Sequence, residues 1–185
     1  AGDALNSEAF HCLSQSQVCS LLEPRHLVEM VRYLSMQIGS RGTVLGQAID
    51  MDTSGHTHMS RDAILRQHAL KTGYLFKAAI MLPAIAQGLN TNHETYRTLD
   101  TFADNIGLAF QVQDDILDLT ASSEQAGKAT MKDQNQAKGN YAVHFGLKEA
   151  NTLVNALQEE SMALLKTLGP NATQLSELTE RLFNR

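Results

Sequence analysis

Three aspartates stand close together inside an apolar helical pattern, and this run constrains the fold more than any other feature of the sequence. Asp114 and Asp118 are four residues apart, so on a helix they lie one turn apart on one face, with Asp115 beside them and Gln111 one turn earlier. Two carboxylates about 6 Å apart repel by about 3 kcal/mol at an effective dielectric constant of about 20. Because apolar residues flank the run on both sides, it predicts a divalent-cation site. Oxygen ligands without Cys or His favour magnesium.

The same aspartates also fit a solvated acidic patch on an amphipathic helix. Basic residues elsewhere favour the metal site. Lys71 and Thr72 lie in a stretch with apolar residues at helical spacing, and Lys128 and Lys138 follow the acidic run. Lysine is a compact, rotatable charge suited to phosphate oxygens, and Thr72 and Gln111 add further donors. Together these residues predict a diphosphate bridged to the protein by magnesium.

Composition indicates a single all-α domain over residues 1–185. The chain is 43% hydrophobic, with no Trp and three Pro, and no Pro/Gly/Ser-rich linker divides it. The net charge of -5 argues against nucleic acid as a partner. No apolar run approaches the ~20 residues that span a bilayer, so we expect no stable membrane insertion. Cys12 and Cys19 are read as reduced thiols of a cytoplasmic protein. Helices are expected near residues 4–19, 24–38, 41–49, 60–88, 93–119, 141–166 and 172–184.

Several strings, taken in order, resemble the trans-isoprenyl diphosphate synthase family, and within it the bacterial farnesyl diphosphate synthases. The run from Gly107 to Asp118 is similar to the second aspartate-rich motif of that family, and Lys71-Thr72-Gly73 to its K-T-G motif. The resemblance covers essentially the whole chain. The other matching strings are residues 1–10 (the helix after the first aspartate-rich motif), residues 46–50 (G-Q-x-x-D), Gly127-Lys128 and Lys138.

The resemblance implies a role for each matching residue. Asp114 would ligate magnesium directly, while Asp115 and Asp118 would hold water molecules of the metal. Thr72 would lie beside the reacting carbons, where its oxygen stabilises developing positive charge. The remaining implied roles are contact with the allylic diphosphate for Lys71, Lys128 and Gln111, closure of the site for Lys138, and the pocket wall for Gln47 and Asp50.

The family further implies an isoprenoid synthase-type helical bundle that acts as a homodimer in the cytoplasm. The implied reaction joins an allylic diphosphate (dimethylallyl or geranyl) to isopentenyl diphosphate, forming farnesyl diphosphate with Mg²⁺, or with Mn²⁺ in its place. The N-terminal helices of the family, with the first aspartate-rich motif, have no counterpart in this chain. We therefore expect these 185 residues alone to be inactive. The family usually reads G-K-S/T-T-x-P at the last lysine, whereas residues 137–142 read A-K-G-N-Y-A, which puts efficient closure in doubt.

Two other functions remain open from the sequence. A class I terpene cyclase shares the helical fold and metal-triggered ionisation, although the K-T-G and the late D-D-x-x-D argue against it. A non-catalytic partner subunit of a prenyltransferase is the other alternative. Such subunits typically have degraded acidic motifs, whereas all three aspartates of this run are present.

Overall fold

The structure is a computed structural model that describes residues 2–52, 59–125 and 139–184, and in these ranges it contains helices and no strand. All-α architecture is therefore confirmed. The helices are α1 (Gly2–Ser14), α2 (Ser16–Leu21), α3 (Pro24–Ile38), α4 (Thr43–Asp52), α5 (Arg61–His68), the π-helical segment η2 (Ala69–Gly73), α6 (Tyr74–Ala86), α7 (Glu94–Gln125), α9 (Tyr141–Phe145), α10 (Leu147–Thr167), the 3-10 segment η3 (Gly169–Ala172) and α11 (Thr173–Phe183).

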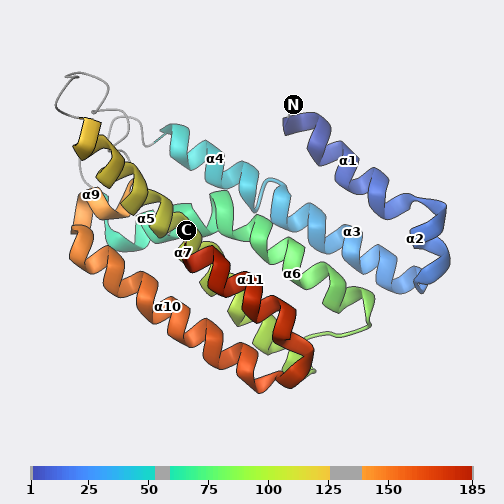
Figure 1. The fold of residues 1–185 in the computed structure, drawn as a ribbon. Helices are drawn as coiled ribbons and strands as arrows, with labels where there is room; N and C mark the ends of the chain where they lie inside the picture. The colour runs from blue at the N-terminus through green and yellow to red at the C-terminus, as the bar shows by residue number, and fades with distance from the viewer. Residues whose placement is uncertain (1, 53–58, 126–138, 185) are drawn as a thin grey trace.

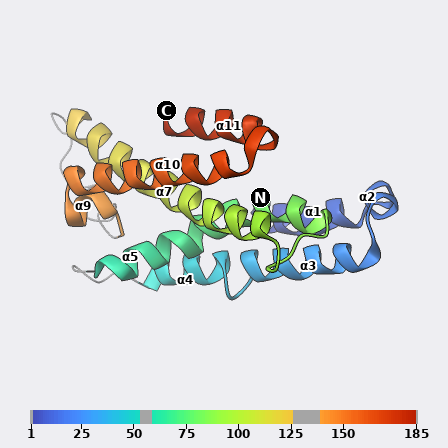
Figure 2. The same ribbon diagram turned by 90° about the horizontal axis from the view of Figure 1, so that it is seen from below.

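The long helix α7 runs through the middle of the molecule (Figures 1 and 2). It packs against α6 and η2 on one side and against α10 on the other, with α3 beyond α6. Much of the apolar surface of α7 is used within the chain, because Phe102, Ala103, Ile106, Ala109 and Val112 are all buried. These buried residues therefore give no independent support to the homodimer that the family resemblance implies.

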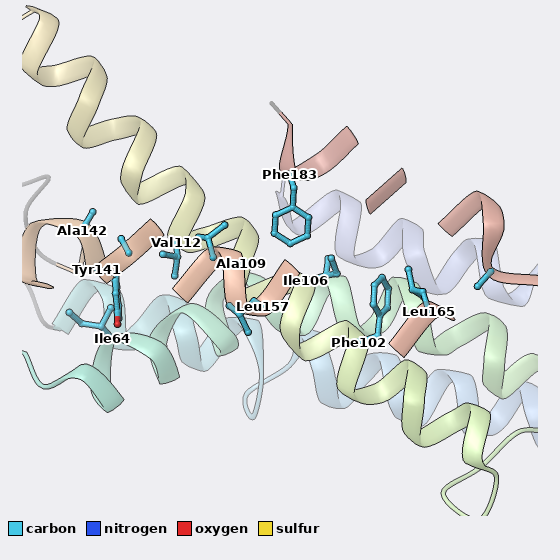
Figure 3. Close-up of a cluster of buried hydrophobic side chains, with 13 residues drawn as sticks. Ile64, Phe102, Ile106, Ala109, Val112, Tyr141, Ala142, Leu157, Leu165 and Phe183 are labelled. Atoms are coloured by element: carbon cyan, nitrogen blue, oxygen red, sulfur yellow. The ribbon is translucent and has the colours of Figure 1, made fainter. Parts of the chain in front are cut away.

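The main core lies where α7 meets α5, α9, α10 and α11 (Figure 3). Tyr141 and Phe102 are its largest fully buried side chains, and Phe183 from α11 closes it from the C-terminal side. A smaller apolar cluster joins α3 to α6 through Leu34, Ile38 and Ala78. Burial of large aromatic side chains contributes about 1.5–3 kcal/mol each to folding. This core fixes α5 and α9 against the helix that carries the acidic run.

Helix boundaries depart from the predicted ones where the backbone changes conformation. The predicted helix 4–19 is divided at Gln15, which has extended backbone angles and begins α2 as its N-cap. The predicted helix 141–166 is divided at Gly146, whose φ of 85° is a conformation that other residues rarely adopt. Asn140 caps α9 through its side-chain oxygen, which accepts from Val143 N.

The helix from Arg61 to Ala86 is continuous but changes to π-helical geometry over residues 69–73. Among the described residues it is the one helix long and apolar enough, by length and composition, to cross a membrane. It packs against α3, α4 and α7, as a core helix of a bundle does. The helix lies within the stretch 60–88 that the sequence predicts as helical, and the expected absence of membrane insertion stays a prediction.

Candidate active site

Two glycines let the backbones of α4 and α7 approach the π-helical segment. A Cβ at Gly46 would lie 2.3 Å from Lys71 N, and a Cβ at Gly107 would lie 2.6 Å from the Cα of Gly73. No larger side chain fits at either contact without a backbone shift. A π-helical turn inserts one residue and so changes which side chains face the neighbouring helices, and such turns are frequent at functional sites. The Lys-Thr-Gly string therefore lies against the helix of the aspartates.

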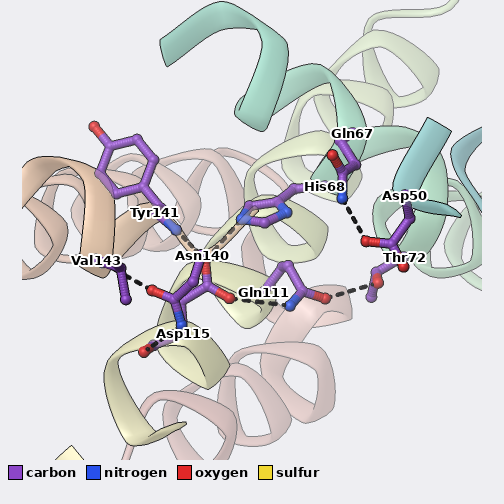
Figure 4. Close-up of polar contacts among 9 residues, drawn as sticks. All are labelled: Asp50, Gln67, His68, Thr72, Gln111, Asp115, Asn140, Tyr141 and Val143. Carbon is purple, nitrogen blue, oxygen red and sulfur yellow. Dashed lines mark hydrogen bonds and ion pairs between the residues drawn. The ribbon is translucent and has the colours of Figure 1, made fainter. Parts of the chain in front are cut away.

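Thr72 and Gln111 face each other across this contact (Figure 4). Thr72 Oγ1 donates to Gln111 Oε1 at 2.8 Å, and Gln111 Nε2 donates to Asp115 Oδ1 at 3.4 Å. Lys71, the residue before Thr72, has its Nζ 2.6 Å from Asp50 Oδ2. The structure thus brings together, from three helices, five residues that the sequence predicted for the site.

Asp115 differs from the other two aspartates because it is buried, with 5% of its surface exposed. Its Oδ2 lies 2.8 Å from His68 Nε2 and accepts a hydrogen bond from Tyr141 N at 2.6 Å. Its main-chain oxygen accepts from Asn140 Nδ2 at 3.0 Å. Asp114 is half-buried and Asp118 is exposed.

The structure also shows where the other predicted residues lie. Asp50 Oδ1 accepts from Gln67 Nε2 at 2.6 Å, so this carboxylate holds both a glutamine and a lysine. Gln47, on the same helix, is exposed. Lys128 and Lys138 lie outside the described residues.

Sequence reasoning did not single out His68, Gln67, Asn140 or Tyr141. His68 is three residues before Lys71, at the end of α5, and it is buried. A buried histidine on an apolar face needs a polar partner, but its spacing does not say which helix supplies that partner. Tyr141 packs beneath the Arg61 guanidinium, 5.8 Å from the ring centroid, and burial raises the pKa of its phenol although Arg61 opposes the change.

Comparison with known proteins identifies the family. The polyprenyl synthetase family model matches residues 1–181. The chain belongs to the polyprenyl synthetase family. Farnesyl diphosphate synthase of Escherichia coli is 36% identical over 96% of this chain and 58% of its own length. Farnesyl diphosphate synthase of Micrococcus luteus is 35% identical over all of this chain and 61% of its own.

Solved structures of polyprenyl synthetases have the same fold. A geranyltransferase from Helicobacter pylori, complexed with magnesium and isoprenyl diphosphate, superposes with a TM-score of 0.76 and is 34% identical. That superposition covers 99% of this chain and 58% of the other. The chain thus spans about 60% of the length of the curated synthases it matches. The site residues described above lie within the part that all of them share with it.

Proposed function

We propose that this protein, at its full natural length, is a prenyltransferase that joins dimethylallyl or geranyl diphosphate to isopentenyl diphosphate and releases diphosphate, with farnesyl diphosphate as the product. The observation that carries the proposal is the Thr72–Gln111 hydrogen bond of 2.8 Å beside Lys71. This bond joins the hydroxyl of Thr72 to the amide of Gln111, which also contacts Asp115 of the acidic run, and Lys71 is the residue next to Thr72. The similarity to farnesyl diphosphate synthases supports the same reaction.

The donor set of the acidic run fits magnesium. Within the described residues, no group of three His, Cys, Asp or Glu side chains forms a complete metal cage. Magnesium is typically held by one or two carboxylates together with substrate phosphates and retained water. Asp114 and Asp118, one helical turn apart and accessible to solvent, offer such a pair. Magnesium bound there would neutralise charge on the departing diphosphate, and Mn²⁺ would serve in its place.

The residues of this chain would act on the allylic substrate in the following way. Lys71 would bind a diphosphate oxygen, with Lys128 and Lys138 proposed as further cations of the same substrate. The allylic C–O bond breaks, and its electron pair leaves with the diphosphate. The double bond of isopentenyl diphosphate then attacks the allylic cation, and the released diphosphate takes up the proton that the new cation loses. Thr72, one residue from Lys71, would place its oxygen beside the cation.

A product assay tests this proposal against the other functions. Protein at full natural length is incubated with geranyl diphosphate and magnesium, with and without isopentenyl diphosphate. Farnesyl diphosphate that forms only with isopentenyl diphosphate supports prenyl transfer. A hydrocarbon or alcohol formed from geranyl diphosphate alone would instead show a terpene cyclase. No turnover with either mixture would favour a partner subunit and refute the proposal. In the same assay we expect residues 1–185 alone to form no farnesyl diphosphate.

Assembly and location complete the proposal. We propose a cytoplasmic homodimer, supported by the likeness to the family and not by any surface of this chain. Light scattering of the full-length protein at micromolar concentration tests it, and a monomeric mass contradicts it.

A further inference from the structure

Asp115 has neither the exposure nor the partners that a magnesium ligand needs. Magnesium keeps several of its water molecules when it binds to protein, so its carboxylate ligands face solvent or substrate. Asp115 is 5% exposed, and its Oδ2 already meets His68 Nε2 and the main-chain N–H of Tyr141. One carboxylate oxygen accepts about two hydrogen bonds, so Oδ2 has no lone pair left. Only Oδ1 remains, and it faces the Gln111 amide.

The charge of Asp115 decides which way the Gln111 amide points. A carboxylate can only accept hydrogen bonds, so the NH₂ group of Gln111 must face it, as the 3.4 Å contact with Nε2 shows. The amide oxygen must then face Thr72. An amide oxygen can only accept, so the Thr72 hydroxyl donates its proton to Gln111 at 2.8 Å. The carboxylate of Asp115 thus fixes the direction of the Gln111 amide, and the Gln111 amide fixes the direction of the Thr72 hydroxyl.

The direction of the Thr72 hydroxyl decides where the lone pairs of its oxygen point. Because the hydroxyl proton is donated to Gln111, both lone pairs of Oγ1 point away from Gln111. An electron-poor carbon is attracted by lone pairs and repelled by a hydroxyl proton. If the amide were reversed, its NH₂ group would take a lone pair of Thr72 and release the hydroxyl proton toward the substrate. The direction of the Gln111 amide therefore decides whether Thr72 can stabilise a cation.

The position of Asp115 is itself fixed from both sides. His68 holds it from the end of α5, and Tyr141 N holds it from the start of α9. The Asn140 side chain links the main-chain oxygen of Asp115 to Val143 N, at 3.0 and 2.9 Å. The Tyr141 side chain is fully buried in the core, so the main-chain N–H that contacts Asp115 is held in place. Asp115 thus has a defined orientation before any ligand arrives.

We propose that Asp115 is a positioning residue that acts through Gln111 to orient the Thr72 hydroxyl, and that metal binding falls to Asp114 and Asp118. This inference rests on the proposed prenyl transfer. Under this proposal the acidic run has two faces on α7. Asp114 and Asp118 face the metal, and Asp115 faces the hydrogen-bonded interior. His68 belongs to the second face as the group that holds Asp115.

The test is a double-mutant cycle in the full-length protein, with geranyl diphosphate and isopentenyl diphosphate as substrates. Asp115→Asn keeps the shape of the side chain but lets Gln111 reverse. We expect kcat to fall about tenfold or more, with the half-saturating magnesium concentration within about twofold of wild type. In the Thr72→Val background, which has no hydroxyl to orient, Asp115→Asn should cause a further loss below about twofold. Mn²⁺ binding without substrate, measured by electron paramagnetic resonance, should be unchanged by Asp115→Asn.

A second variant covers the case in which Asp115→Asn fails to fold. Gln111→Met removes the amide and leaves the His68, Asp115 and Tyr141 contacts intact, so it should lower kcat in wild type and add little in Thr72→Val. A tenfold rise in the magnesium requirement or weaker Mn²⁺ binding in Asp115→Asn would overturn the inference. So would full additivity of either variant with Thr72→Val. A wild-type protein that forms no farnesyl diphosphate would refute the proposed function instead.

Discussion

Lys71 and Asp50 form an ion pair between η2 and α4, with Nζ 2.6 Å from Oδ2. Lys71, which we propose binds the substrate diphosphate, is therefore already held by a carboxylate, and Gln67 donates to the other oxygen of that carboxylate. Both members of the pair are partly exposed, which leaves the ammonium group able to donate to a second anion. Asp50, predicted as pocket wall, thus orients the cation.

Replacement of Lys71 by Gln is expected to weaken diphosphate binding about tenfold. A hydrogen bond to a charged group contributes about 1.5–3 kcal/mol, and about 1.4 kcal/mol corresponds to a factor of ten. Titration calorimetry with inorganic diphosphate and magnesium measures the change. Lys166→Gln, an exposed lysine on α10, is the matched control and should leave the affinity unaltered. Equal affinities of Lys71→Gln and wild type would remove Lys71 from the diphosphate site.

Asp114→Ala should reduce turnover by orders of magnitude while the protein stays folded. A carboxylate that holds the metal acts mainly on the transition state, and Asp114 is outside the buried core. Turnover at saturating magnesium and the thermal midpoint without substrate are the two measurements. Glu160→Ala, which removes an exposed carboxylate from α10, serves as the control. Near-normal turnover of Asp114→Ala at saturating magnesium contradicts the assignment.

Gly107→Ala should destabilise the protein by about 1–3 kcal/mol, the usual cost of overpacking. The new Cβ would lie 2.6 Å from the Cα of Gly73, so one of two backbones must move. Gly2→Ala is the control, because nothing lies within 4 Å of its Cβ position. Urea denaturation measures both. Equal stability of Gly107→Ala and wild type would show that the close approach of η2 and α7 is not required.

Lys77 gives a prediction for alkaline pH. Burial lowers the pKa of Lys77, but the hydrogen bond to Asp104 and the charges of Asp104 and Asp100 outweigh it and raise the pKa above 10.5. Because the pKa is raised in the folded state, the stabilisation is complete below pH 10.5 and is lost as the pH rises through the folded pKa. Lys77→Met should cost about 1 kcal/mol at pH 7, since water screens the partly exposed carboxylates.

The measurement is the difference in unfolding free energy between wild type and Lys77→Met at increasing pH. The difference should be constant from neutral pH to about 10 and should decrease above the ordinary lysine range. A difference that grows with pH would contradict a raised pKa for Lys77 in the folded protein.

Periodicity predicted the fold because helices are recognised from local residue spacing. The apolar spacing and the scarcity of proline gave helices at nearly every position where the structure has one. The break at Gly146 was missed because one glycine inside an apolar pattern does not show whether its φ will be positive. The π-helical turn at Lys71 was missed for a related reason. The residues packed against it, Gly46 and Gly107, are distant in sequence.

The sequence by itself determined the helical fold and predicted one site for an acidic run, a lysine and a threonine, because motif order and residue chemistry are written along the chain. It could not determine how the three aspartates divide their roles. A helical period places Asp115 about 100° around the helix from Asp114, but only the packing of α5 and α9 puts His68 and Tyr141 N against it. Burial and hydrogen-bond partners are properties of the assembled bundle. The tertiary structure therefore decided which carboxylate faces inward and which two remain accessible to a cation.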